Sequence, residues 1–207
     1  MTDVGQYKFA HKINYIITFD DGLESAYSYA FPLLVENGCK AIFFIITDYI
    51  GKPGFMSKAQ VRELVASGMR VASHSKSHPN ISELSPMRAK SEFIDSKNCL
   101  EDLIGSEVLD FSFPFGKFRD DQVTLARMCG YRSIYGSRHG LVGANQFVFP
   151  RNAINASMLE SQLAGIIGLK VKTRLGWVLE DIAKTVLKKT LGDAAYRSLR
   201  DAALLSK

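Results

Sequence analysis

The chain has 207 residues, of which 46% are hydrophobic and 23% charged, and its net charge is +5. This length and composition suit one globular domain with a well-buried core, which excludes a fibrous or largely disordered protein. Its three cysteines are widely spaced and odd in number, so we expect reduced core thiols rather than a disulfide framework or a cysteine metal site; they are Cys39, Cys99 and Cys129.

Two further classes are disfavoured by the sequence. No hydrophobic run approaches the length of a membrane span, and residues 1–12 lack the basic start and apolar centre of a signal peptide. We therefore expect a cytoplasmic protein. Nucleic acid is not an expected partner, because the chain has no known nucleic-acid-binding motif and no interleaving of basic and aromatic residues.

The first predicted strand is hydrophobic and β-branched, and it ends in two adjacent carboxylates, Asp20 and Asp21, followed by Gly22. Two carboxylates held close together repel each other unless a cation or a shared proton compensates them. Asp is also a good helix N-cap and Gly a good turn residue, so the same residues suit a simple turn before a helix. The pattern alone leaves both interpretations open.

Helices and strands alternate along the rest of the first 136 residues. Capping residues and hydrophobic spacing predict helices at 24–37, 57–66, 85–104 and 121–129, with Pro32 indicating a kink or a late start in the first of them. Strands are predicted at 40–47, 71–73, 109–113 and 131–136. This alternation predicts right-handed parallel βαβ units.

Two of the four histidines, His74 and His78, follow the predicted strand at 71–73 and are four residues apart. One helical turn would place them on the same face. Two imidazoles and one carboxylate form a three-ligand set that leaves positions open for water, as in catalytic sites for zinc and other divalent metals. A histidine pair with this spacing also occurs on ordinary helix surfaces.

The segments 18–22 (Thr-Phe-Asp-Asp-Gly) and 74–79 (His-Ser-x-x-His-Pro) resemble the first two motifs of the polysaccharide deacetylase family, also called carbohydrate esterase family four or the NodB homology domain. The resemblance implies an α/β fold, a distorted or incomplete (β/α) barrel of about six to seven parallel strands. The barrel would comprise residues 1–156, and a basic helical extension packed on it would comprise residues 157–207.

The same resemblance implies a site. Asp21, His74 and His78 would bind a divalent metal, with Zn²⁺ the first choice and Co²⁺, Ni²⁺ or Fe²⁺ as alternatives, and Asp20 would be the general base. A third match, the segment Phe113, Pro114, Phe115 and Gly116, resembles the turn that lines the substrate groove, where the Phe115 N–H would help to hold an oxyanion. All these residues follow predicted strands, and in barrels the carboxyl ends of the strands form the active site.

Two family features are missing. No histidine follows His139, so the late Leu-x-His motif that supplies the general acid is absent, and Ser112 stands where the family has the arginine that tethers the catalytic Asp. His139 could supply the proton and Arg151 could pair with Asp20. The alternatives are a solvated loop histidine and a surface arginine.

Residues 170–207 contain nine Lys or Arg and four Asp or Glu, so their balance of +5 equals that of the whole chain. A basic amphipathic helix can lie on an anionic membrane, including the inner membrane surface. We favour the alternative, in which these helices pack on the barrel and cover an open edge.

The sequence therefore predicts a divalent-metal-dependent hydrolase that removes N- or O-linked acetyl groups from a polysaccharide or a lipid-linked glycan. Because these two motifs are missing, an alternative is kept beside the enzyme. It is a catalytically weakened or inactive relative that acts as a metal-containing glycan-binding module. Hydrolysis of a non-sugar amide ranks last, because relatives with that activity generally alter the Asp pair.

Overall fold

The computed structural model describes residues 15–142, 146–154 and 158–167, together with the single residues Gly176, Thr190 and Ala195. The chain forms two compact units, one comprising Met1–Gly136 with Ala144–Phe149 and the other Ser137–Gly143 with Pro150–Lys207. The predicted domain boundary at 156 stays a prediction, and the predicted basic helices beyond residue 170 lie outside the described residues apart from the three single positions.

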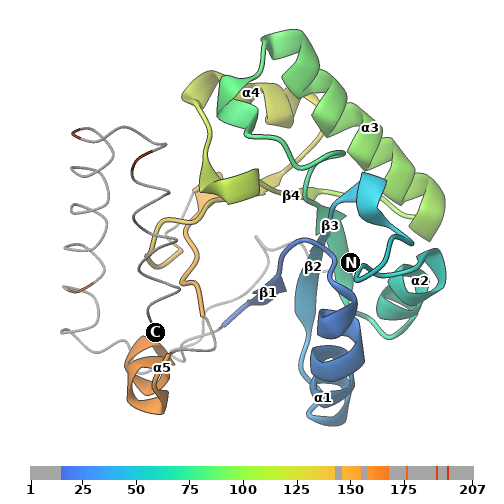
Figure 1. Ribbon diagram of the computed structural model, residues 1–207, viewed down its shortest axis with the longest axis vertical. Helices are drawn as coiled ribbons and strands as arrows, with labels where there is room; N and C mark the ends of the chain where they lie inside the picture. The colour runs from blue at the N-terminus through green and yellow to red at the C-terminus, as the bar shows by residue number, and fades with distance from the viewer. Residues whose placement is uncertain are drawn as a thin grey trace. The chain divides into compact units, whose positions relative to one another are not determined.

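The first unit contains a parallel sheet whose strands are hydrogen-bonded in sequence order (Figure 1). Among the described residues the strands are β1 (Ile17–Phe19), β2 (Ala41–Ile45), β3 (Arg70–Ser73), β4 (Asp110–Ser112), β5 (Ser133–Tyr135) and β6 (Val148–Phe149). A doubly wound sheet reverses its strand order, whereas a (β/α) barrel adds each new strand on the same side. The six strands in sequence order therefore confirm the predicted incomplete barrel.

Helices connect successive strands from β1 to β5, as predicted. They are the π-helical turn η2 (Ala26–Ala30), which continues into α1 (Phe31–Glu36), then α2 (Lys58–Ala66), α3 (Pro86–Ile104) and α4 (Asp120–Met128). Short 3₁₀ turns follow several strands, namely η3 (Thr47–Tyr49), η4 (Ile81–Glu83) and η5 (Pro114–Gly116), and α5 (Glu160–Ile167) belongs to the second unit.

The helix ends have the caps that the sequence predicts. Ser57 and Gln60 form a capping box at the start of α2, and the Ser85 side chain accepts the Arg88 N–H at the start of α3. Gly105 ends α3 in the left-handed conformation, with φ of 69°. Pro32 lies in the first turn of α1, which accounts for the late start of that helix after the π-helical turn.

The core lies mainly between the sheet and the helices. Alternating strand residues face outward and pack with helix residues in one large cluster, which includes Phe43, Val71, Phe93, Phe111 and Ile134. The other strand residues form a smaller cluster of Ile42, Phe44, Ala72 and Tyr135, against which Phe149 packs. The sheet is therefore hydrophobic on both faces, as expected for parallel strands.

A partly buried ion pair joins two neighbouring strands. Arg70 on β3 lies 3.1 Å from Asp110 on β4, whose side chain is only 4% exposed, and the Tyr135 hydroxyl donates a hydrogen bond of 3.4 Å to the same carboxylate. Burial raises the pKa of Asp110, while Arg70 opposes this shift. The sequence analysis did not find this pair, because strand spacing does not show which charges face inward.

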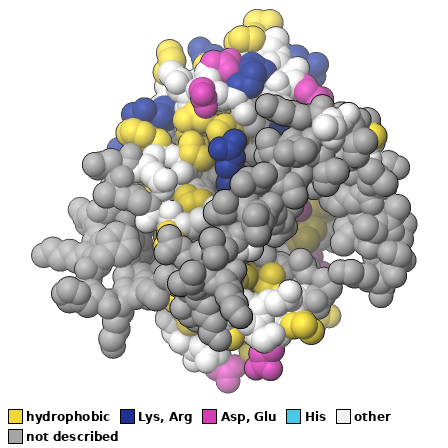
Figure 2. Space-filling view, turned by 90° about the vertical axis from the view of Figure 1, so that its left-hand side faces the viewer, with side chains coloured by type: hydrophobic (Ala, Val, Ile, Leu, Met, Phe, Trp, Pro, Cys, Tyr) yellow, Lys and Arg dark blue, Asp and Glu magenta, His cyan; other side chains and the backbone are white. Residues whose placement is uncertain are grey.

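The cysteine prediction is partly wrong. Cys39 and Cys99 are free and exposed rather than part of the core, whereas Cys129 is half-buried and burial raises the pKa of its thiol. Within the described part of the chain, no helix is both long and apolar enough to cross a membrane. Figure 2 shows hydrophobic, basic and acidic side chains of the described residues beside one another toward the top of the face that it draws.

Candidate metal centre

The carboxyl ends of β1, β3 and β4 carry an unusual backbone. Among the described residues, every non-glycine residue with positive φ lies in the loops that follow these strands: Asp21 (70°), Ser75 (65°), His78 (61°) and Phe115 (59°). Such a conformation costs a residue with a side chain about 1–3 kcal/mol and persists only where the surrounding structure enforces it. Its restriction to one edge of the sheet indicates a functional site there.

The loop after β1 begins with two left-handed residues, Asp21 and Gly22. A Cβ atom at Gly22 would lie 3.1 Å from Cδ1 of Ile45, so glycine is required both by φ (72°) and by the close packing. The Gly22 carbonyl accepts the Met56 N–H at 2.9 Å, which ties the turn to the segment before α2. This tight turn presents the Asp21 carboxylate to the two histidines.

The loop after β3 corrects one part of the sequence analysis. His74 and His78 do not share a helix; His74 directly follows β3, and a turn with left-handed residues at Ser75 and His78 brings the second ring back to the first. The ring centroids lie 4.9 Å apart. The histidines are therefore brought together by a strained turn and not by helical spacing.

A backbone carbonyl fixes the orientation of His74. Its Nδ1 atom lies 2.8 Å from the Ser112 carbonyl oxygen on β4, and the side chain is only 3% exposed. A carbonyl can only accept, so Nδ1 carries the proton and the Nε2 lone pair is left for a ligand bond. This is the arrangement in which a second partner sets the tautomer of a metal-ligating histidine.

The three predicted ligand side chains converge on one point. Nε2 of His74 and Nε2 of His78 each lie 3.4 Å from Oδ1 of Asp21, and one ligand atom from each residue lies within 4.8 Å of the others. Two ligands bound at about 2.1 Å to a tetrahedral ion are about 3.4 Å apart, so the donor set and its spacing fit a divalent metal. Three protein ligands leave a position open for water or substrate.

Burial and the neighbouring charged groups both shift the pKa of His78. Burial lowers its pKa, His74 lowers it further, and the carboxylates of Asp21 and Asp20 raise it, with a net lowering. The lowered pKa favours the neutral imidazole, which is the form that binds a metal. Asp20, whose carboxylate is one of the two that raise this pKa, directly follows β1 and precedes the candidate ligand Asp21.

The segment after β4, which the sequence predicts to be a substrate-binding turn, has two buried residues and two that are at least partly exposed. Phe113 is fully buried in the core, where its ring stacks on Phe118 with centroids 4.7 Å apart, and Pro114 is also buried. Phe115 is 62% exposed and its ring centroid lies 4.7 Å from that of His78, while Gly116 is partly exposed. The structure therefore places the Phe113 and Pro114 side chains in the core and the Phe115 side chain beside the cluster, and the substrate-binding role of the segment stays a prediction.

His139 and Arg151 belong to the second unit, and both are half-buried. The Arg151 N–H donates to the Arg138 carbonyl at 2.9 Å, and Asn152 exchanges two hydrogen bonds of 3.1 Å with the Gly140 backbone. The two segments that carry His139 and Arg151 are thus paired with each other. The predicted roles of His139 as general acid and of Arg151 as the partner of Asp20 stay predictions.

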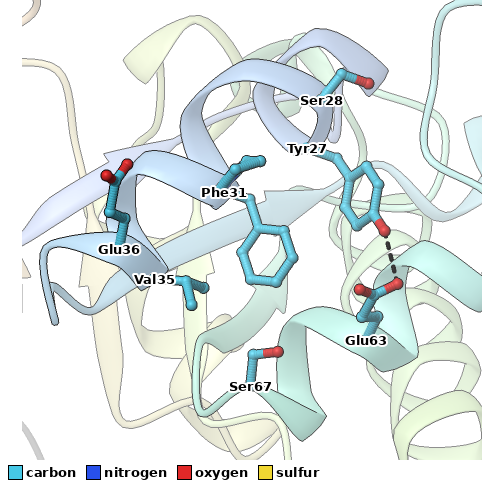
Figure 3. A pocket seen from close by; sticks show the side chains of 8 residues that line it. Tyr27, Ser28, Phe31, Val35, Glu36, Glu63 and Ser67 are labelled. Atoms are coloured by element: carbon cyan, nitrogen blue, oxygen red, sulfur yellow. Dashed lines mark hydrogen bonds between the residues drawn. The ribbon is translucent and has the colours of Figure 1, made fainter.

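A separate groove of about 590 Å³ lies between α2 and the continuous helical segment of η2 and α1 (Figure 3). Its lining includes Phe31, Val35, Tyr27 and Glu63, and the Tyr27 hydroxyl donates a hydrogen bond of 2.6 Å to Glu63, which raises the pKa of the phenol. None of its lining residues belongs to the His and Asp cluster. The groove has no metal-binding histidine or thiol, so the chemistry is placed at the cluster instead.

The fold and the cluster together define the class of protein. It is a (β/α) barrel with a candidate metal centre, formed by two histidines and a carboxylate, at the carboxyl ends of its strands. The chain belongs to the polysaccharide deacetylase family, because the sequence profile of that family, described as "Polysaccharide deacetylase", matches residues 10–134. This match includes the three candidate ligands and Asp20, and it confirms the resemblance seen in the sequence.

Relatives and solved structures agree with this assignment. Over 142 residues the chain is 28% identical to YxkH of Bacillus subtilis, a protein with a provisional polysaccharide deacetylase name, covering 69% of this chain and 51% of that one. It is 24% identical over 162 residues to the poly-beta-1,6-N-acetyl-D-glucosamine N-deacetylase of Staphylococcus aureus, covering 70% and 55%. The chain thus spans about half the length of these curated relatives.

The fold is shared with the Streptococcus pyogenes deacetylase PplD, whose structure was solved in complex with acetate. The TM-score is 0.69 and the identity 25%, and the match covers 73% of this chain and 69% of that chain. The incomplete barrel is thus an arrangement that a solved deacetylase shares.

Sequence reasoning missed two groups that shape the cluster. The Ser112 carbonyl is a backbone atom, so no residue type at that position could have revealed it. Glu92 on α3 accepts hydrogen bonds from the backbone between the two histidines, but in the sequence it is one charged residue of an amphipathic helix. Only the tertiary structure identifies either contact.

The difference in burial between the Phe113 and Phe115 side chains can be tested through the stability of the fold. Phe113→Ala is expected to destabilise the fold by about 3–5 kcal/mol, because it empties a fully buried site. Phe115→Ala is expected to change stability by less than about 1 kcal/mol, because its ring is mostly exposed. Thermal unfolding of both variants beside the parent chain checks this, and equal losses of melting temperature would contradict the assignment of Phe113 to the core.

Proposed function

We propose that this chain is a divalent-metal-dependent hydrolase that removes acetyl groups from a glycan. The observation that carries the proposal is the convergence of Asp21, His74 and His78 within 4.8 Å at the carboxyl ends of two barrel strands. Family membership supports the same activity, since the matched region includes all three residues.

The metal would be held by one carboxylate oxygen and two Nε2 atoms. When bound, a divalent ion polarises an acetyl carbonyl and lowers the pKa of water, which is the chemistry that amide or ester hydrolysis requires. Zinc is our first choice because it favours tetrahedral sites with nitrogen and oxygen ligands. Cobalt, nickel and iron suit the same donors, and their availability in the cell decides among them.

The remaining residues would move protons and hold charge. Asp20, which lies between β1 and the candidate ligand Asp21, would take the proton of the attacking water. The Phe115 N–H would donate to the developing oxyanion. His139 would protonate the leaving amine or alkoxide, and Arg151 would orient Asp20 in place of the arginine that Ser112 replaces.

The expected substrate is an acetylated polysaccharide or lipid-linked glycan. The name of the Staphylococcus aureus relative, an N-deacetylase of poly-beta-1,6-N-acetyl-D-glucosamine, supports an N-acetyl group as the first substrate to try. An O-acetyl ester remains the alternative. The cytoplasmic location and the membrane contact through the basic C-terminal segment, which lies outside the described residues, stay predictions.

A second candidate function is a glycan-binding module that keeps the metal but has little or no activity. The observation that favours it is Ser112, whose position holds the tethering arginine in the family pattern. This candidate requires the same metal cluster, so only turnover separates the two functions.

The base role of Asp20 predicts the first kinetic result. Asp20→Asn should lower the rate of acetate release from acetylated oligosaccharides by about 10²-fold or more, because the water loses its proton acceptor. Metal content should stay unchanged. Asp102→Asn, which removes the same charge from an exposed position on α3, is the matched control and should keep the parent rate.

Two results would separate the candidates. Full activity in Asp20→Asn would contradict the base role. Tight glycan binding by the parent chain, without any acetate release, would favour the binding module over the enzyme.

The acid role of His139 predicts a second kinetic result. His139→Ala should lower the rate by about 10²-fold, since the leaving group would no longer receive a proton. Arg138→Ala, at the neighbouring exposed position, is the control. An unchanged rate in His139→Ala would reject His139 as the general acid and leave Asp20 unaffected as the base.

A further inference from the structure

The turn between the two histidines is held by a carboxylate from another element. Glu92 on α3 accepts the backbone N–H groups of Lys76 and Ser77 on its Oε2 atom, each at 2.9 Å, and the Ser77 hydroxyl on its Oε1 atom at 2.7 Å. These three hydrogen bonds end on the two residues in the middle of the His74–His78 turn. Hydrogen bonds to an ionised carboxylate are among the stronger ones in proteins.

The opposite side of the turn is bound to η3. The Thr47 N–H donates to the Ser75 carbonyl at 3.3 Å, and the Asp48 N–H donates to the Lys76 carbonyl at 2.9 Å. Glu92 thus accepts hydrogen bonds from the N–H groups of the turn, and the N–H groups of η3 donate hydrogen bonds to the carbonyls of the turn. The segment is therefore fixed from two elements that belong to the same compact unit.

This fixation is needed because the turn is strained at both ends. Ser75 and His78, on either side of the residues bound by Glu92, have φ values of 65° and 61°. Residues with side chains leave this conformation unless other contacts enforce it. The backbone angle at His78 sets the direction of its ring, and that ring places Nε2 3.4 Å from Asp21.

We propose that Glu92 is a positioning residue for the metal centre, whose carboxylate holds the turn so that His78 points its Nε2 atom at the metal position. The inference rests on the proposed function, because it needs a metal at Asp21, His74 and His78. It adds a residue on α3 to the site and assigns it an effect on metal affinity rather than on the chemical step.

The same helix offers a matched control. Asp95 pairs with the Lys76 ammonium group at 3.1 Å and accepts the Ser91 hydroxyl at 2.9 Å, and both side chains of its ion pair are more than 40% exposed. Asp95→Asn removes the same negative charge close to the same turn, but it leaves the backbone amides of the turn bound to Glu92. A difference between the two variants therefore reports the backbone contacts and not the local charge.

The experiment is a titration of the purified metal-free chain with Co²⁺, followed by visible absorption. Glu92→Gln is expected to weaken Co²⁺ binding by about 10- to 100-fold and to change the ligand-field spectrum, because the loss of an outer partner lets a ligand rotate. Asp95→Asn is expected to bind Co²⁺ within about twofold of the parent with the same spectrum. Thermal unfolding of the metal-free variants checks that both are folded.

Three outcomes would overturn the proposal. Parent-like affinity and spectrum in Glu92→Gln would show that the turn does not need Glu92, and equal losses in both variants would show a charge effect only. If the parent chain binds no Co²⁺, the metal site of the proposed function fails, and this inference fails with it.

A second variant covers the case in which Glu92→Gln does not fold. Ser77→Ala removes one of the three hydrogen bonds at an exposed position and should weaken Co²⁺ binding by about threefold, in the same direction. Unchanged affinity in a folded Ser77→Ala variant would then contradict the proposal.

Discussion

The Asp21 carboxylate, placed 3.4 Å from the Nε2 atoms of both His74 and His78, is the interaction on which the site depends. Two of its three members have left-handed backbones, so the local chain alone would not maintain it. The barrel compensates by close packing at Gly22, by the Ser112 carbonyl on His74 and by the contacts around the His78 turn. The strain of the loops is thus offset by the rigid elements that carry them.

The departures from the family pattern fall on proton transfer and not on metal binding. Ser112 lacks the side chain that would orient Asp20, but its carbonyl still fixes the tautomer of His74. The replacement candidates His139 and Arg151 belong to the second compact unit, on segments that pair with each other. Both the enzyme and the binding module require the candidate metal cluster, and they differ in whether the chain still transfers protons.

Much of the fold follows from local sequence signals. Ser85, Pro86 and Gly105 mark the ends of α3 as predicted, because caps act through the nearest backbone groups. His74 and His78 lie side by side as predicted, but not through helical spacing, since the positive φ that brings them together depends on tertiary contacts and cannot be read from residue spacing. The motif match did not show that the Phe113 side chain is buried, although strand alternation places it with the buried Phe111 on the helix-facing side.

The central claim is that Asp21, His74 and His78 bind one divalent metal, and the most direct test is the metal content of the purified chain beside a His78→Ala variant. The account predicts about one divalent ion per chain in the parent and its loss in the variant, while His139→Ala retains it. No bound metal in the parent, even after incubation with zinc or cobalt, would contradict the account and leave these motifs as scaffold only.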